Sequence, residues 1–150
     1  MEIKKVGSGA LLAVVLAACA APEEQRQSLR ETALAEGFVQ VPAEDVPALF
    51  VDATHVGTLS DGEWQSYYAA DSSLRGTFQG SQGKETDVGT YRVTPEGVYC
   101  REWSRWGNGQ EGCAEVYQKG DVLRMIVVSG RIGRTPHYDA MHQPGNPFEL

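Results

Sequence analysis

The feature that most constrains the fold is a series of short, β-prone runs separated by turn-forming residues. The runs are rich in Val, Ile, Thr, Tyr and Trp, and they recur at a spacing of about 8 to 12 residues. Glycine, aspartate, asparagine and proline, which favour tight turns, separate them. No helix of useful length fits between Gly57 and Gly133, so the pattern predicts an antiparallel meander and not βαβ units. The expected strands are Thr54–Leu59, Glu63–Ala69, Leu74–Gln79, Asp87–Thr94, Gly97–Ser104, Gly112–Gln118 and Val122–Val128.

The last of these strands, Val122–Val128, indicates whether the faces of the sheet are buried. Leu123, Met125 and Val127 share one face of it, and the opposite face, which includes Ile126, is also mostly apolar. A strand that is apolar on both faces is typical of a central or barrel position. For a chain of 150 residues we therefore expect one mainly β domain, a small barrel or sandwich with one or two short N-terminal helices.

The N-terminal sequence has the pattern of an export signal. Lys4 and Lys5 precede an apolar run, Val6 to Ala18, that is too short for a bilayer, which needs about 20 residues. The order Leu16-Ala17-Ala18-Cys19 resembles the lipobox of bacterial lipoproteins, which implies that Cys19 is acylated and becomes the new N-terminus. We expect a signal peptide over residues 1–18, a lipid anchor and polar tether over 19–40, and the β domain over 41–150. Ala20 after Cys19 favours the periplasmic face of the outer membrane over the inner membrane.

Two segments before the strands have weak helical character. Leu29, Ala33 and Leu34 form a thin apolar stripe that ends near Gly37, so residues 20–37 are either a tether or a loosely docked helix. Pro42–Val46 has the proline and acidic residues that favour the first turn of a second short helix.

Cys100 and Cys113 would both lie outside the cytoplasm, where an even pair of cysteines predicts a disulfide. A redox-active pair is the alternative, but the chain has no Cys-x-x-Cys motif. If the two cysteines face each other across a hairpin, Arg101 opposes Gly112. We then expect an irregular, exposed loop over residues 104–109.

A longer pattern resembles a known family. Gly89-Thr90-Tyr91-Arg92-Val93 is followed by Cys100-x-x-Trp103 and then by Cys113. This order is similar to that of a functionally uncharacterised family of small secreted or lipid-anchored proteobacterial domains, over about residues 46–150. The resemblance implies a small β domain with a disulfide, and it transfers no catalytic residue.

The best candidate for recognition lies beside the cysteines. Arg101, Trp103, Arg105 and Trp106 combine basic and aromatic side chains, which could stack on a sugar or hold an acidic partner. The alternative is that Trp103 fills the core beside the disulfide. Trp106, next to Gly107 in the expected loop, is then the more exposed anchor.

The other residues that could carry chemistry are expected to have structural roles. His137, Asp139 and His142 have the residue types of a zinc site, but Pro136, Pro144 and Pro147 predict a surface strap without fixed geometry, so we expect no metal and no cofactor. His55 is expected to be an ordinary strand residue. There is no Gly-x-Ser-x-Gly nucleophile motif. The carboxylates of the meander are expected to be solvated turn residues; they are Asp61, Glu63, Asp71, Glu85 and Asp87.

These observations favour a non-enzymatic lipoprotein of the cell envelope that binds an envelope protein or a small ligand at a barrel mouth. The net charge of −7 speaks against nucleic acid as a partner, because phosphate binding depends on Lys and Arg. The acyl chains on Cys19 would make the membrane its other partner. Two alternatives stay open: a small hydrolase or glycan-modifying enzyme that uses Asp or Glu at strand ends, and an inhibitor of an envelope-attacking enzyme.

Overall fold

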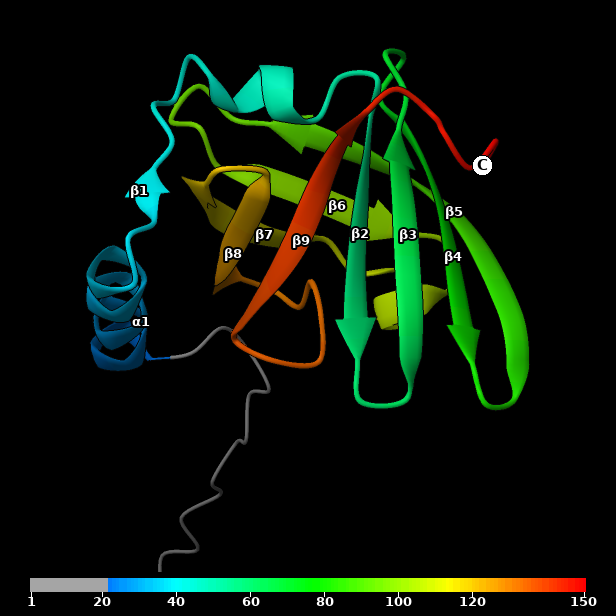
Figure 1. Ribbon diagram of the computed structural model, residues 1–150, viewed down its shortest axis with the longest axis horizontal. Helices are drawn as coiled ribbons and strands as arrows, with labels where there is room; N and C mark the ends of the chain where they lie inside the picture. Colours follow the sequence, from blue (N-terminus) through cyan, green and yellow to red (C-terminus); the bar gives the residue numbers. More distant parts are fainter. Residues whose placement is uncertain (1–21) are drawn as a thin grey trace, which may run out of the picture.

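The computed structural model describes residues 22–150, so the expected signal peptide and Cys19 lie outside the described residues. This part of the chain forms one α-helix, nine strands and two short 3₁₀ helices (Figure 1). In chain order they are α1 (Glu23–Ala35), β1 (Val39–Gln40), η1 (Val46–Leu49), β2 (Ala53–Leu59), β3 (Gly62–Tyr68), β4 (Ser73–Gly80), β5 (Gly83–Val93), β6 (Tyr99–Trp103), η2 (Trp106–Gly109), β7 (Gly112–Lys119), β8 (Val122–Ser129) and β9 (His137–Pro144). Within this part, no helix is both long and apolar enough to cross a membrane.

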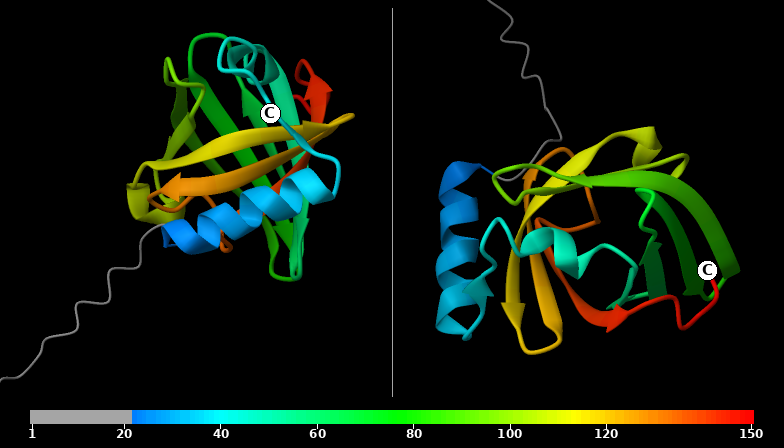
Figure 2. Two further views of the ribbon diagram at one scale, coloured as in Figure 1. Left: turned by 90° about the vertical axis from the view of Figure 1, so that its left-hand side faces the viewer. Right: turned by 90° about the horizontal axis from the view of Figure 1, so that it is seen from above.

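Strands β2 to β9 form a closed antiparallel barrel. Each strand pairs with the next along the chain, and β9 pairs back with β2, for example His142 with His55. The short β1 adds to the end of β7, where Val39 pairs with Gln118. Of the barrel and the sandwich that the sequence left open, the structure shows the barrel (Figure 2).

One end of the barrel is closed by η1 and by aromatic side chains. The Phe50 ring, which follows η1, stacks on Tyr99 with the ring centroids 4.2 Å apart, and it meets Tyr68 edge to face at 5.1 Å. All three residues are fully buried. The opposite end carries η2, the turns β2–β3 and β4–β5, and residues 130–136, and we call it the mouth (Figure 1).

Helix α1 packs on the outside of the barrel. Ala33 is fully buried in a cluster with Phe38, Tyr117 and Ile126, and the Arg30 guanidinium donates to both carboxylate oxygens of Glu115 at 2.8 Å. The segment is therefore a docked helix. Its contact explains why β8 is apolar on both faces: Leu123 and Met125 pack in the barrel core, while Ile126 meets the helix side.

The disulfide and its register are confirmed. Cys100 and Cys113 are bonded, with their Cα atoms 4.0 Å apart, and they pair directly across β6 and β7. Arg101 pairs with Gly112, as the facing arrangement requires. The loop that follows β6 forms η2, in which Gly107 and Asn108 adopt left-handed backbone angles.

Three expectations about the elements need correction. The expected strap around His137 and His142 is wrong, because this segment is β9, which pairs with both β2 and β8 and closes the barrel. Strand β5 begins at Gly83, before the expected Asp87, because the β4–β5 hairpin continues to the tight turn. The second helix is a single 3₁₀ turn that begins at Val46, after Pro42–Asp45.

Candidate ligand-binding cavity

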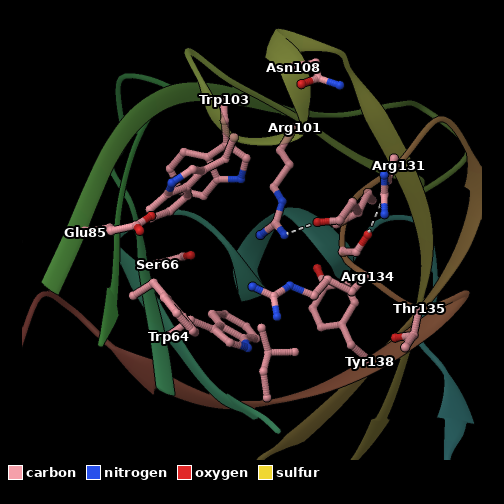
Figure 3. Close-up of a pocket in the computed structure, with 16 residues that line it drawn as sticks. Trp64, Ser66, Glu85, Arg101, Trp103, Asn108, Arg131, Arg134, Thr135 and Tyr138 are labelled. Carbon is pink, nitrogen blue, oxygen red and sulfur yellow. Dashed lines mark hydrogen bonds between the residues drawn. The ribbon is translucent and has the colours of Figure 1, made fainter. Parts of the chain in front are cut away.

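A cavity of about 390 Å³ opens at the mouth of the barrel (Figure 3). Aromatic rings form much of its wall, and arginines lie both deep in it and at its rim. The residues that line it are Leu59, Trp64, Ser66, Phe78, Glu85, Arg101, Trp103, Trp106, Gly107, Asn108, Arg131, Ile132, Gly133, Arg134, Thr135 and Tyr138. Concave, mainly apolar sites with a few convergent polar groups are the usual form of small-molecule sites in proteins.

Inward-facing glycines make room for the tryptophan rings. A Cβ atom added at Gly57 would lie 2.4 Å from the Trp64 ring, and one added at Gly76 would lie 2.5 Å from the Trp103 ring. Both distances are far below van der Waals contact, so each indole occupies space that a side chain at the neighbouring glycine would need. The absence of side chains at Gly57 and Gly76 therefore lets the Trp64 and Trp103 rings pack close to the backbone of β2 and β4.

Trp103 and Trp106 form one side of the cavity. Their rings meet edge to face, with centroids 4.9 Å apart. Trp103 is 7% exposed and belongs to β6, whereas Trp106 is partly buried and belongs to η2. Because Trp106 comes from a loop element, its position depends on what holds η2 in place.

A buried carboxylate holds η2. Asp87, 5% exposed on β5, accepts hydrogen bonds from the backbone N–H groups of Arg105 at 2.9 Å and Trp106 at 2.8 Å. It also accepts from the Ser104 hydroxyl at 2.8 Å and from the Val88 N–H at 2.9 Å. Burial by itself raises the pKa of Asp87, but these hydrogen bonds outweigh it and lower the pKa to about 2. Asp87 is thus a structural anchor of the rim, and its interpretation as a solvated turn residue is wrong.

Arg101 points into the barrel from β6 (Figure 3). One terminal nitrogen donates to the Ile132 carbonyl at 2.5 Å, and the other lies 3.5 Å from the Tyr68 hydroxyl. The guanidinium carbon lies 5.4 Å from the Trp103 ring centroid and 5.6 Å from that of Tyr138. The charge is therefore held between two aromatic rings deep in the cavity.

The rim carries further arginines. Arg134 comes from the segment before β9 and forms an ion pair of 2.7 Å with Asp61 in the β2–β3 turn. Its guanidinium carbon lies 5.7 Å from the Phe78 ring centroid, so the side chain bridges two parts of the mouth. Arg131 lies beside it and donates to the Gly133 carbonyl at 3.4 Å.

The structure brings together three of the four residues predicted for recognition. Arg101, Trp103 and Trp106 all line the cavity, whereas Arg105 does not. The Arg105 side chain is 72% exposed and turns to the outer side of the rim, 3.6 Å from Asp87. Trp103 combines the two roles that the sequence left open, since it is a core residue and also part of the cavity wall.

The residues considered for a metal site do not converge. Asp139 faces outward and forms a two-pronged ion pair with Arg124, at 2.7 and 2.8 Å. His142 faces the barrel interior, where its Nδ1 lies 3.4 Å from Nε2 of His55. His55 is a buried residue of β2, as expected, with Nε2 2.8 Å from the Leu49 carbonyl.

Among residues 22–150, the one group of potential metal ligands close enough to share an ion is Cys100, Glu111 and Cys113. Both of these cysteines are consumed in the disulfide, so the group offers no thiolate.

Sequence reasoning missed the far wall of the cavity. Trp64 on β3, Tyr138 on β9 and Arg134 come from segments distant from the Arg101–Trp106 cluster. Strand alternation could have placed Trp64 on the same face as Tyr68, because the two are an even number of residues apart. Tyr138 could be found only after the strap had been recognised as a strand.

In comparisons with known proteins, no protein-family model matches this chain and no curated protein matches it significantly.

Proposed function

We propose that the protein is a non-catalytic binding protein of the cell envelope that holds a small, largely apolar ligand in the mouth of its barrel. The observation that carries this proposal is the aromatic-walled cavity of about 390 Å³. Its volume lies in the lower part of the range of about 300 to 1,000 Å³ that is typical of small-molecule sites. A concave site of this kind suits a small molecule better than the flat surface of a protein partner.

The carboxylates of the cavity support binding over hydrolysis. Glycoside hydrolysis ordinarily needs two carboxyl groups, roughly 5 to 10 Å apart, on either side of the bond that is cleaved. Glu85 is the single carboxylate that lines this cavity in the described part of the chain. Asp87, the nearest buried acid along β5, already uses both oxygens to hold η2.

The envelope location is part of the proposal and rests on the resemblance of residues 16–19 to a lipobox. Acyl chains on Cys19 would fix the barrel to a membrane, with the periplasmic face of the outer membrane favoured by Ala20. Burial of each acyl methylene contributes about 0.8 kcal/mol, so several chains make a lasting anchor.

The test is a fluorescence titration with N-phenyl-1-naphthylamine, an uncharged aromatic probe that brightens in apolar surroundings. We expect saturable binding of one probe per protein. Trp106→Ala should weaken it roughly tenfold, because it removes an aromatic wall whose contact area is worth about 1 to 2 kcal/mol. Val88→Ala is the matched control, since Val88 is 58% exposed on the outside of the same region. Absence of saturable binding, or equal affinity in Trp106→Ala and the parent protein, would contradict the proposal.

A further inference from the structure

Arg101 has hydrogen-bonding capacity that the described part of the protein does not use. Its Nε atom is shielded from solvent and has no hydrogen-bond partner. The interaction with Tyr68 is long, at 3.5 Å, which leaves the Ile132 carbonyl as the one short acceptor. A guanidinium carries five N–H donors in a planar fork that fits carboxylate or phosphate oxygens two at a time.

No carboxylate among residues 22–150 lies within ion-pair distance of Arg101, in contrast to several other arginines of this protein. Arg30, Arg92, Arg124 and Arg134 each contact an Asp or Glu. Those pairs lie on the outside of the barrel or at its rim, whereas Arg101 lies within the barrel. A charge removed from water without an opposite charge is costly, so its position calls for a counterion.

A second unsatisfied donor lies next to it. The Tyr138 hydroxyl is shielded from solvent and has no hydrogen-bond partner in the described part of the protein. Burial raises the pKa of Tyr138, while Arg101 opposes that effect, and the net direction is upward. The hydroxyl is therefore protonated at neutral pH and able to donate.

The charge of the cavity is opposite to that of the molecule. Arg101, Arg131 and Arg134 line it together with Glu85 as its one carboxylate in the described part. Asp61 pairs with Arg134 at the rim, and an excess of positive charge still remains, although the whole chain has a net charge of −7. In Figure 3 the Arg101 side chain reaches toward the middle of the ring formed by the lining residues. A low-dielectric cleft lined by one sign of charge concentrates ions of the opposite sign.

We infer that the ligand is an organic anion: an apolar or aromatic body that packs against Trp64, Trp103 and Trp106, with one oxyanion group such as a carboxylate bound by Arg101 and Tyr138. This inference rests on the proposed function and specifies the ligand class for the same cavity. The oxyanion accepts from the guanidinium and from the Tyr138 hydroxyl, and the apolar body lies toward the mouth.

The test uses two probes that differ by one group. 8-Anilino-1-naphthalenesulfonate is N-phenyl-1-naphthylamine with an added sulfonate, an oxyanion. We expect the full protein to bind the sulfonate probe at least tenfold more tightly than the uncharged one. Arg101→Met should weaken binding of the sulfonate probe about 10- to 100-fold, because it removes a charge-assisted hydrogen bond. The ratio of the two affinities, which cancels any general change in the cavity, should therefore fall in Arg101→Met, and Arg101→Lys should fall between the parent and Arg101→Met.

Two further variants separate ligand binding from a structural role for Arg101. Tyr138→Phe removes a hydroxyl that has no protein partner, so thermal stability without ligand should not fall, while affinity for the sulfonate probe should drop about three- to tenfold. Arg92→Met is the matched control, because Arg92 pairs with Glu111 on the outside of the barrel and is 55% exposed.

The outcomes distinguish the two proposals. Binding of both probes with equal affinity, unchanged in Arg101→Met and Tyr138→Phe, would overturn the anion inference and leave the binding proposal standing. Binding of neither probe would overturn both. A sulfonate preference that depends on Arg101 and Tyr138 but not on Arg92 supports both.

Discussion

Asp87 is the residue that holds the rim of the cavity in place. Its Oδ2 accepts from two successive backbone N–H groups of the η2 loop, and its Oδ1 accepts from Ser104 and Val88. Four donors directed at one buried carboxylate fix the start of η2, and with it the position of Trp106.

We therefore predict that Asp87→Asn destabilises the protein by about 2 kcal/mol, because an amide N–H₂ would face N–H donors that are left unsatisfied. Asp45→Asn is the control, since Asp45 is exposed and makes no side-chain hydrogen bond at η1. Urea denaturation monitored by tryptophan fluorescence measures the free energy of unfolding of both variants. Equal midpoints for the two variants would show that Asp87 does not anchor the loop.

His55 makes stability depend on pH. It is fully buried against Leu49, His142 and Phe50. Burial, opposed by the Leu49 hydrogen bond and assisted by His142 and Arg101, lowers its pKa from 6.5 to about 3. Burial also lowers the pKa of His142. The unfolded chain then binds protons that the folded protein does not, so the stabilisation is complete above pH 6.5 and is lost as the pH falls from there toward 3.

The expected contribution of His55 to the slope between pH 6 and pH 5 is about 1 kcal/mol per pH unit. In His55→Phe the slope should be smaller, whatever the absolute stability of the variant. The free energy of unfolding at several pH values measures it. Parallel pH profiles for the parent and the variant would refute this role of His55.

At the scale of elements, α1 is part of the domain. Its one fully buried residue, Ala33, faces Tyr117 and Ile126. The middle of the helix is held by Arg30 with Glu115, and its C-terminal end by Lys119, which donates to the Glu36 carbonyl at 2.7 Å. The apolar face of α1 is narrow, so a single substitution in it should detach the helix from the barrel.

Ala33→Glu is expected to undock α1 while the barrel stays folded, because it places a charge in an apolar contact without a partner. Ala35→Glu introduces the same residue two positions later, where the helix is exposed. Hydrogen–deuterium exchange should show loss of protection over residues 23–35 in the first variant alone. Protection that persists in Ala33→Glu would mean that the ion pairs alone hold the helix.

The elements also show what the sequence could and could not predict. All seven expected runs are strands, because the turn residues between them are local signals that tertiary contacts did not override. Strand β9 differs from the expected strap, because prolines in a sequence predict breaks in a strand. Pro136 lies before the strand and Pro144 ends it, so neither interrupts the pairing with β2 and β8.

Part of the candidate site could likewise be predicted from the sequence, and part of it could not. Arg101, Trp103 and Trp106 are close in sequence, so their meeting could be predicted from one hairpin. Trp64, Tyr138 and Arg134 join them only because the barrel closes between β9 and β2. That Arg101 has no ion-pair partner is a three-dimensional property, because the carboxylate of Asp87 on β5 is held by η2 and that of Glu115 on β7 is held by Arg30.

In the whole molecule, the position of α1 determines which end of the barrel lies nearer the expected lipid anchor. The helix starts near the mouth, where Arg26 donates to the Val128 carbonyl, and ends beside Lys119 partway along the barrel wall (Figure 1). If Cys19 is acylated, as we propose, only a few residues separate the membrane surface from Glu23. The mouth end of the barrel then lies nearer the membrane than the closed end.

Spin labels at two exposed turns test this orientation in acylated protein on vesicles. Gln82→Cys places a label in the β4–β5 turn at the mouth, and Glu96→Cys places one in the β5–β6 turn at the closed end. We predict that a lipid-soluble relaxation agent broadens the signal at position 82 more than that at 96. The reverse order would show that the closed end faces the membrane.

The proposed ligand packs its apolar part against the tryptophans of the barrel mouth and its oxyanion against Arg101. A crystal structure of the protein with 8-anilino-1-naphthalenesulfonate would show both contacts. We predict that the aromatic rings of the probe lie against Trp64, Trp103 and Trp106, and that a sulfonate oxygen lies about 2.8 Å from a guanidinium nitrogen of Arg101. A probe bound outside the barrel, or one whose sulfonate points away from Arg101 into solvent, would contradict this proposal.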